Sequence, residues 1–228
     1  QRVFPPRAVP GSFEPETADV YEAGLKTSNA AGTVRFDLAG FYTRYRDIQV
    51  RVLDVIAPGT GNAAAGRVYG AEAELTLRPV KPLTLQFSAG FLDTGYTKFA
   101  ADFDPSQGIE KGDRFVNSPK WSLAGSASYV VPLGEIGDLT VRGDWSYRSK
   151  TYSDAANSEN IAQSGYHLFN ATLLYDTPDK LWQVAAGIRN ITDKRYLLTG
   201  NNEFGGFGYV EGVFARPREW SLSVRRSF

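Results

Sequence analysis

Apolar and polar residues alternate with a period of two along most of the chain. Residues 121–131 carry Trp, Leu, Gly, Ala, Tyr and Val at odd positions, with Ser or Ala at positions 122–128 between them. Residues 139–148 repeat the pattern, and there the second face carries Arg142, Asp144 and Arg148. Successive strand residues point to opposite faces, so the pattern predicts β-strands with one apolar face. The charged face cannot be a dry core.

The alternation predicts nine strands joined in an antiparallel meander. The strands cover residues 20–28, 34–38, 71–77, 83–91, 121–131, 139–148, 169–175, 182–189 and 218–228. Short connections at 29–32, 78–82, 132–138 and 177–180 alternate with long ones at 47–65, 96–118, 149–163 and 193–217. This alternation is typical of an outer-membrane β-barrel, which has short periplasmic turns and long extracellular loops.

Aromatic residues on the apolar face gather near the strand ends: Trp121, Tyr129, Trp145, Tyr147, Tyr175, Trp182 and Trp220. In a membrane barrel such residues form girdles at the headgroup level. The alternative is the packed core of a soluble β-sandwich, in which the apolar face would be buried.

Composition removes several classes of function. The 25 Lys+Arg residues balance 25 Asp+Glu residues, so no nucleic-acid partner is indicated. The chain has no cysteine and one histidine, His167, which excludes thiolate and multi-histidine metal sites. No apolar run approaches the roughly 20 residues of a membrane helix. We expect no metal, no cofactor and no catalytic residue.

Several motifs follow one another in a recognisable order: FEPE at 13–16 with YEAGLK at 21–26, FY at 41–42 with YRDIQ at 45–49, RVYGAEAE at 67–74, NSPKW at 117–121, YRS at 147–149, RNITDKRY at 189–196, and PREW at 217–220. In this order they resemble the C-terminal part of the barrel of TonB-dependent receptors. The resemblance implies a bacterial outer-membrane protein that takes up a scarce ligand, most often a ferric siderophore. It also implies partnership with outer-membrane lipid and the TonB complex.

The resemblance also bears on domain organisation. Barrels of this family have 22 strands around a plug, and nine strands ending on the periplasmic side correspond to the last nine. Residues 1–228 are then a partial barrel domain, without the plug, the TonB-contacting region and the first strands, and residues 1–18 are the remnant of an extracellular loop. If one strand is missed or invented, a complete small barrel of eight or ten strands, acting as a hydrolase or a passive pore, remains the alternative.

The last strand resembles the signal that the barrel assembly machinery reads. Trp220, Leu222 and Val224 alternate toward the terminal Phe228. Arg226 departs from the pattern, since an aromatic residue is usual there. A long cationic side chain at this depth can reach the headgroups at small cost.

The resemblance places ligand binding in the extracellular loops. The candidates combine aromatic and amide groups, which suit a flat chelate: Tyr152, Asn157, Asn201, Asn202, Glu203, Phe204, Phe207 and Tyr209. The alternative is that these side chains only pack the loops.

Charged residues on the second face would line the barrel lumen: Arg35, Asp37, Glu72, Glu74, Arg142, Asp144 and Arg189. They are expected to form cross-strand pairs or to hold the plug.

Two further patterns could indicate a calcium site or a hydrolase. Asp102, Asp104 and Ser106, followed by Glu110 and Asp113, have part of the spacing of a calcium loop, but the glycine is displaced and no helices flank it, so a solvated acidic loop is expected. The period of two puts His167 on the apolar face. A hydrolase would need a lumen hydroxyl, such as that of Ser126 or Ser128, within hydrogen-bond reach of that ring.

Overall fold

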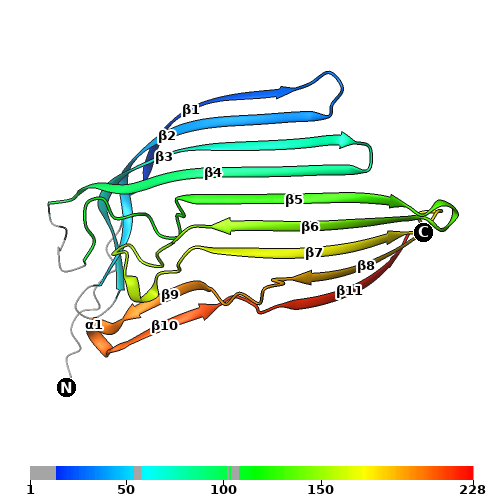
Figure 1. The fold of residues 1–228 in the computed structure, drawn as a ribbon. Coiled ribbons are helices and arrows are strands. Elements are labelled where there is room, and N and C mark those ends of the chain that lie inside the picture. The colour runs from blue at the N-terminus through cyan, green and yellow to red at the C-terminus, as the bar shows by residue number, and fades with distance from the viewer. Residues whose placement is uncertain (1–13, 54–57, 102, 104–107, 228) are drawn as a thin grey trace.

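One antiparallel sheet of nine strands forms most of the protein (Figure 1). The computed structural model describes residues 14–53, 58–101, 103 and 108–227. The strands are β1 (Thr17–Ser28), β2 (Val34–Leu53), β3 (Pro58–Val80), β4 (Leu83–Phe99), β5 (Trp121–Pro132), β6 (Asp138–Arg148), β7 (Tyr166–Asp176), β8 (Trp182–Arg189) and β11 (Glu219–Arg226). Each pairs with its neighbour in the chain, and β11 pairs with β8. The predicted all-β meander of nine strands is confirmed.

The two ends of the sheet differ. The short turns and the C-terminus lie at one edge of Figure 1, which we call the short-turn end, and the long connections lie at the other, the long-loop end. The connection from β8 to β11 was expected to be a loop throughout. It instead contains a two-stranded hairpin, β9 (Leu197–Glu203) and β10 (Tyr209–Phe214), with the single-turn helix α1 (Phe204–Phe207) at its tip.

Helical structure is sparse. Besides α1, the described residues contain two 3₁₀ turns, Gly134–Ile136 and Glu159–Ile161. Within the described part of the chain, none of the helices has the length and apolar character needed to cross a membrane.

The predicted long loop at 47–65 is wrong. β2 continues to Leu53 and β3 starts at Pro58, so the hairpin rises far beyond the expected strand ends. The register shifts between Tyr45 and Ile48, and Asp47 there has a φ of 57°. A β-bulge of this kind breaks the period of two. The alternation in the sequence therefore fades where the strands do not.

Cross-strand register sorts the two faces of the sheet. The row Phe36, Leu75, Phe87, Gly125, Trp145 and Phe169 lies on one face. The row Gln86, Ser126, Asp144 and Asn170 lies on the other. We call these the apolar face and the polar face. Trp121, Tyr129 and Trp182 are more than 40% exposed on the apolar face. Because one sheet leaves its apolar face open, the sandwich alternative is wrong.

The sheet does not close on itself among the described residues. β1 pairs only with β2, and β11 only with β8. The expected loop remnant at 1–18 falls largely outside the described residues, and Thr17 and Ala18 already belong to β1.

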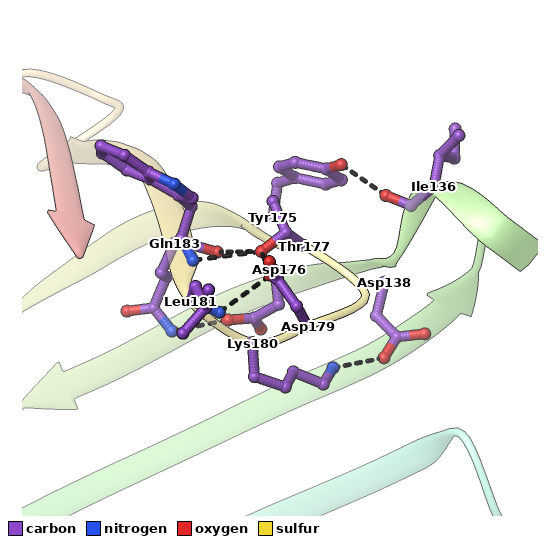
Figure 2. Close-up of polar contacts among 10 residues, drawn as sticks. Ile136, Asp138, Tyr175, Asp176, Thr177, Asp179, Lys180, Leu181 and Gln183 are labelled. Carbon is purple, nitrogen blue, oxygen red and sulfur yellow. Dashed lines mark hydrogen bonds and ion pairs between the residues drawn. The ribbon is translucent and has the colours of Figure 1, made fainter. Parts of the chain in front are cut away.

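Polar contacts fix the short turns to one another (Figure 2). Lys180 Nζ lies 2.7 Å from Asp138 Oδ2, and the Tyr175 hydroxyl donates to the carbonyl of Ile136. The Thr177 hydroxyl donates to Asp179, which lowers the pKa of that carboxyl. These contacts join the turn between β5 and β6 to the turn between β7 and β8.

The last strand presents its apolar residues on one exposed face. Trp220, Leu222 and Val224 are all exposed, while Phe228 lies outside the described residues. Arg226 faces Trp182 of β8, and its guanidinium carbon lies 5.2 Å from the centre of the indole ring. A neighbouring strand thus supplies an aromatic ring at the level where Arg226 replaces one.

Candidate ligand-binding site

A small hydrophobic core lies at the long-loop end. Val50, Ala64, Tyr96 and Ile109 are buried there, and Phe115 packs against them. The loop residues 108–120 and 149–163, which we call the loop cap, thus rest on the extended ends of β2, β3 and β4. Burial of apolar side chains holds the cap in place.

Gly66 makes room for the loop cap. A Cβ atom there would lie 2.4 Å from the ring of Phe115, so only glycine allows this contact without a shift. The N–H of Phe115 donates to Thr94 Oγ1 at 3.0 Å, and that oxygen lies 3.0 Å from Ser118 Oγ. The ring and the backbone of Phe115 are therefore both fixed against the sheet.

Asn157 joins the two halves of the cap. Its Nδ2 donates to the carbonyl of Arg114, and the N–H of Arg114 donates to its Oδ1, both at 2.9 Å. The residue has a φ of 52°, a conformation that asparagine tolerates better than most residues. Both ends of its amide are bound to the chain, which fits the loop-packing alternative.

Tyr152 belongs to a polar cluster on the same loop. Its hydroxyl donates to Glu159 Oε1 at 3.3 Å, and Lys150 Nζ lies 2.5 Å from that oxygen. Lys150 Nζ also lies 4.8 Å from the centre of the Tyr152 ring. The hydrogen bond from Lys150 lowers the pKa of Glu159 and raises the pKa of Lys150.

The β9–β10 hairpin docks on the loop cap through amides. Asn202 Nδ2 donates to Ser158 Oγ at 2.9 Å, and Asn160 Nδ2 donates to Asn202 Oδ1 at 3.1 Å. Ile161 is the most deeply buried side chain described, and a Cβ atom on Gly200 would lie 2.7 Å from its Cβ. Close approach at this glycine seats the hairpin against the loop.

A cavity of about 510 Å³ lies between the loop cap, the hairpin and the ends of β2 and β4. Its walls combine amide, carboxylate and aromatic groups: Gln49, Val50, Tyr96, Ile109, Val116, Ser153, Asp154, Ala155, Ala156, Thr199, Gly200, Asn201, Asn202 and Glu203. Its size falls within the usual range for small-molecule sites.

The structure divides the predicted ligand-binding residues into three groups. Asn201, Asn202 and Glu203 line the cavity. Tyr152 and Asn157 make the contacts within the cap given above. The three aromatic residues of the hairpin tip, Phe204, Phe207 and Tyr209, are 65%, 75% and 47% exposed. They form an open aromatic surface next to the cavity wall.

Sequence reasoning missed Gln49, Tyr96, Ser153 and Asp154. Gln49 and Tyr96 were assigned to loops, because the strand signal ends before them. A period-two count carried across the bulge at 45–48 is the signal that could have found Gln49.

The charged residues that were expected to line the lumen lie on the polar face, but their ion pairs run along single strands. Arg35 Nη2 lies 2.7 Å from Asp37 Oδ2, and Arg142 Nη2 lies 2.7 Å from Asp144 Oδ1. Cross-strand pairing was expected, and in these two pairs the partner is instead two residues away on the same strand. Across the sheet, Asp37 faces Glu74, and Arg189 faces Glu219. Glu72 faces Ala39.

A family model described as "TonB dependent receptor-like, beta-barrel" matches residues 3–191. The chain belongs to this family. The predicted resemblance is thereby confirmed, and the family is one of outer-membrane receptors and transporters rather than enzymes.

Solved receptor structures share the fold. The chain is similar to the ferric yersiniabactin uptake receptor FyuA from Yersinia pestis, at 20% identity and a TM-score of 0.77 over 93% of this chain and 30% of that one. It is similar to BauA, the ferric preacinetobactin receptor from Acinetobacter baumannii, at 24% identity and a TM-score of 0.67 over 91% and 29%. It is also similar to the copper transporter OprC, at 16% identity and a TM-score of 0.69 over 94% and 32%. The chain spans about 30% of the length of these proteins.

The structure also describes His167 and part of the acidic loop. His167 lies on the apolar face, where Trp145 Nε1 donates to its Nδ1 at 3.0 Å, while Ser126 on the polar face donates to Gln86. The arrangement that would have favoured a hydrolase is therefore absent for Ser126 and His167.

Of the acidic loop, Asp102, Asp104 and Ser106 lie outside the described residues, and Glu110 N–H donates to Asp113 at 2.7 Å. The described residues contain no cluster of metal-binding side chains.

Proposed function

We propose that this chain is part of an outer-membrane receptor that takes up a ferric siderophore in a TonB-dependent manner. The observation that carries the proposal is the placement of the 510 Å³ cavity at the long-loop end of a TonB-dependent receptor barrel sheet. In such barrels this end faces the outside, where a scarce ligand arrives. The similarity to FyuA and BauA supports an iron chelate as the ligand.

The chemistry of the cavity suits a chelate. Tyr96 offers an aromatic wall, while Asn201, Asn202 and Gln49 offer amide donors and acceptors. The exposed rings of Phe204 and Phe207 lie on the same hairpin as the cavity wall. Flat aromatic or amide surfaces bind a planar ligand face by stacking and hydrogen bonding.

The remaining partners follow from the same proposal. The nine strands form the C-terminal part of a 22-stranded barrel, whose plug and TonB-contacting region lie outside this chain. The barrel assembly machinery reads the last strand through Trp220, Leu222, Val224 and Phe228. The lumen charges contact the plug. A complete small barrel acting as a passive pore is the competing account.

Ligand binding tests the proposal directly. The receptor that contains these strands is purified from outer membranes and titrated with ferric yersiniabactin, ferric preacinetobactin, ferripyoverdine and Cu²⁺. Quenching of tryptophan fluorescence reports binding. Saturable binding of one ferric chelate, with none of Cu²⁺, supports the proposal. Binding of Cu²⁺ alone would contradict it.

A further inference from the structure

A pair of arginines lies directly opposite each other on the apolar face. Arg44 of β2 faces Arg67 of β3 in the register of the sheet, and both side chains are exposed. Like charges in directly opposed positions, about 5 Å apart at Cβ, destabilise a sheet. The field of two such cations attracts an anion. Neither guanidinium forms an ion pair with a carboxylate of the described residues.

The acid opposite Arg44 forms its ion pair with a third arginine. Asp19 of β1 faces Arg44 across the strands, but its Oδ2 lies 2.7 Å from Arg46 Nη1. One carboxylate thus stands against three arginines. Asp93 of β4, which faces Tyr69 on the same face, lies 3.8 Å from Lys120 Nζ, so this pair adds no net charge and the excess is two positive charges.

The arginines stand immediately above a row of tyrosines. Tyr21, Tyr42 and Tyr69 face one another across β1, β2 and β3, one step nearer the short-turn end. The guanidinium carbons of Arg44 and Arg67 each lie 5.7 Å from the ring centre of the tyrosine on their own strand. Such an aromatic row marks the boundary between the apolar band and the headgroups.

From this placement we infer that Arg44 and Arg67 bind a phosphate group of a glycolipid in the outer leaflet of the outer membrane. The inference rests on the proposed function for its orientation, since the long-loop end then faces outward. Guanidinium groups hold phosphate oxygens with paired, charge-assisted hydrogen bonds, and two opposed arginines can clamp one phosphate. The lipid tails lie along the apolar face below the tyrosines.

The patch lies apart from the ligand-binding cavity. The cavity lining residues come from the loop cap, the hairpin and the strand ends, whereas Arg44 and Arg67 point to the lipid side of the sheet. Loss of lipid binding should therefore leave binding of the ferric chelate intact. Failure of the lipid proposal can thus be distinguished from failure of the proposed function.

The test uses the receptor purified from outer membranes and the double variant Arg44→Gln with Arg67→Gln. The matched control is Arg78→Gln with Lys81→Gln, which removes two exposed cations at the short-turn end. Native mass spectrometry measures the affinity for added lipopolysaccharide, for dephosphorylated lipopolysaccharide and for phosphatidylglycerol. Titration with the ferric chelates in the same preparations reports on the proposed function and on folding.

We expect the double variant to bind lipopolysaccharide about tenfold or more weakly, and the control variant to bind it like the wild type. The wild type should also bind the dephosphorylated form about tenfold more weakly. Unchanged binding by the double variant would overturn the inference. Equal affinity for phosphatidylglycerol would overturn it as well, because the patch would then select charge alone.

Discussion

Asn157 and Arg114 close a reciprocal pair of hydrogen bonds between two loops that are 43 residues apart in the chain. The pair joins residues 108–120 to residues 149–163 above the sheet. Because both backbone groups of Arg114 have their partner in one side chain, we expect this asparagine to hold the two loops together.

Replacing Asn157 with Ala should loosen the cap. The N–H and carbonyl of Arg114 would lose their partner, at a cost of about 1–3 kcal/mol. Hydrogen–deuterium exchange should accelerate in residues 108–120 and leave the sheet unchanged. Asn160→Ala is the control, because its exposed amide donates to the hairpin and not to this loop. Equal exchange in both variants would show that the pair does not hold the cap.

Gly66→Ala should destabilise the loop cap where it packs on β3. The new methyl group would meet the ring of Phe115 at 2.4 Å, and overpacking of this kind costs about 1–3 kcal/mol. Gly143→Ala is the control, since a Cβ atom there meets nothing within 4 Å. Unfolding of the purified receptor, followed by tryptophan fluorescence, should show a lower midpoint for Gly66→Ala only. A midpoint shared with the control would refute the packing argument.

The cluster of Lys150, Tyr152 and Glu159 should respond to acid. The hydrogen bond from Lys150 lowers the pKa of Glu159 from its usual 4.5. The stabilisation is therefore present above about pH 4.5 and is lost as the pH falls through the lowered value. Exchange in residues 149–163 should rise over that window. The variant Glu159→Gln should lose the step, and a step that persists in it would assign the effect to another acid.

The sequence predicted the sheet better than it predicted the loops. Alternation located all nine strands of the main sheet, since each contributes residues such as Leu75, Phe87 and Trp145 to its apolar face. It could not follow β2 and β3 past the bulge at Asp47, where the period of two breaks. The cavity brings together Gln49, Asp154 and Asn202, which the alternation had assigned to three different connections, and no local pattern encodes their contact.

The hairpin tip should contribute to ligand capture. Phe204 and Phe207 are mostly exposed, so replacing both with Ala removes aromatic surface with little effect on folding. Stacking of a planar ligand on an aromatic ring contributes about 1 kcal/mol. Loss of both rings should therefore weaken the affinity for the ferric chelate about tenfold or more. Val213→Ala, an exposed change on the same hairpin, should leave affinity unchanged. Unaltered affinity in the double variant would remove the tip from the site.

Uptake of radioactive iron tests the central claim most directly. Cells that lack other siderophore receptors produce the receptor containing these strands and are given iron as each ferric siderophore, with and without a functional TonB. We predict accumulation of iron from one chelate, and only when TonB is functional. Accumulation that is independent of TonB, or that is equal for all small solutes, would contradict the account and indicate a passive pore.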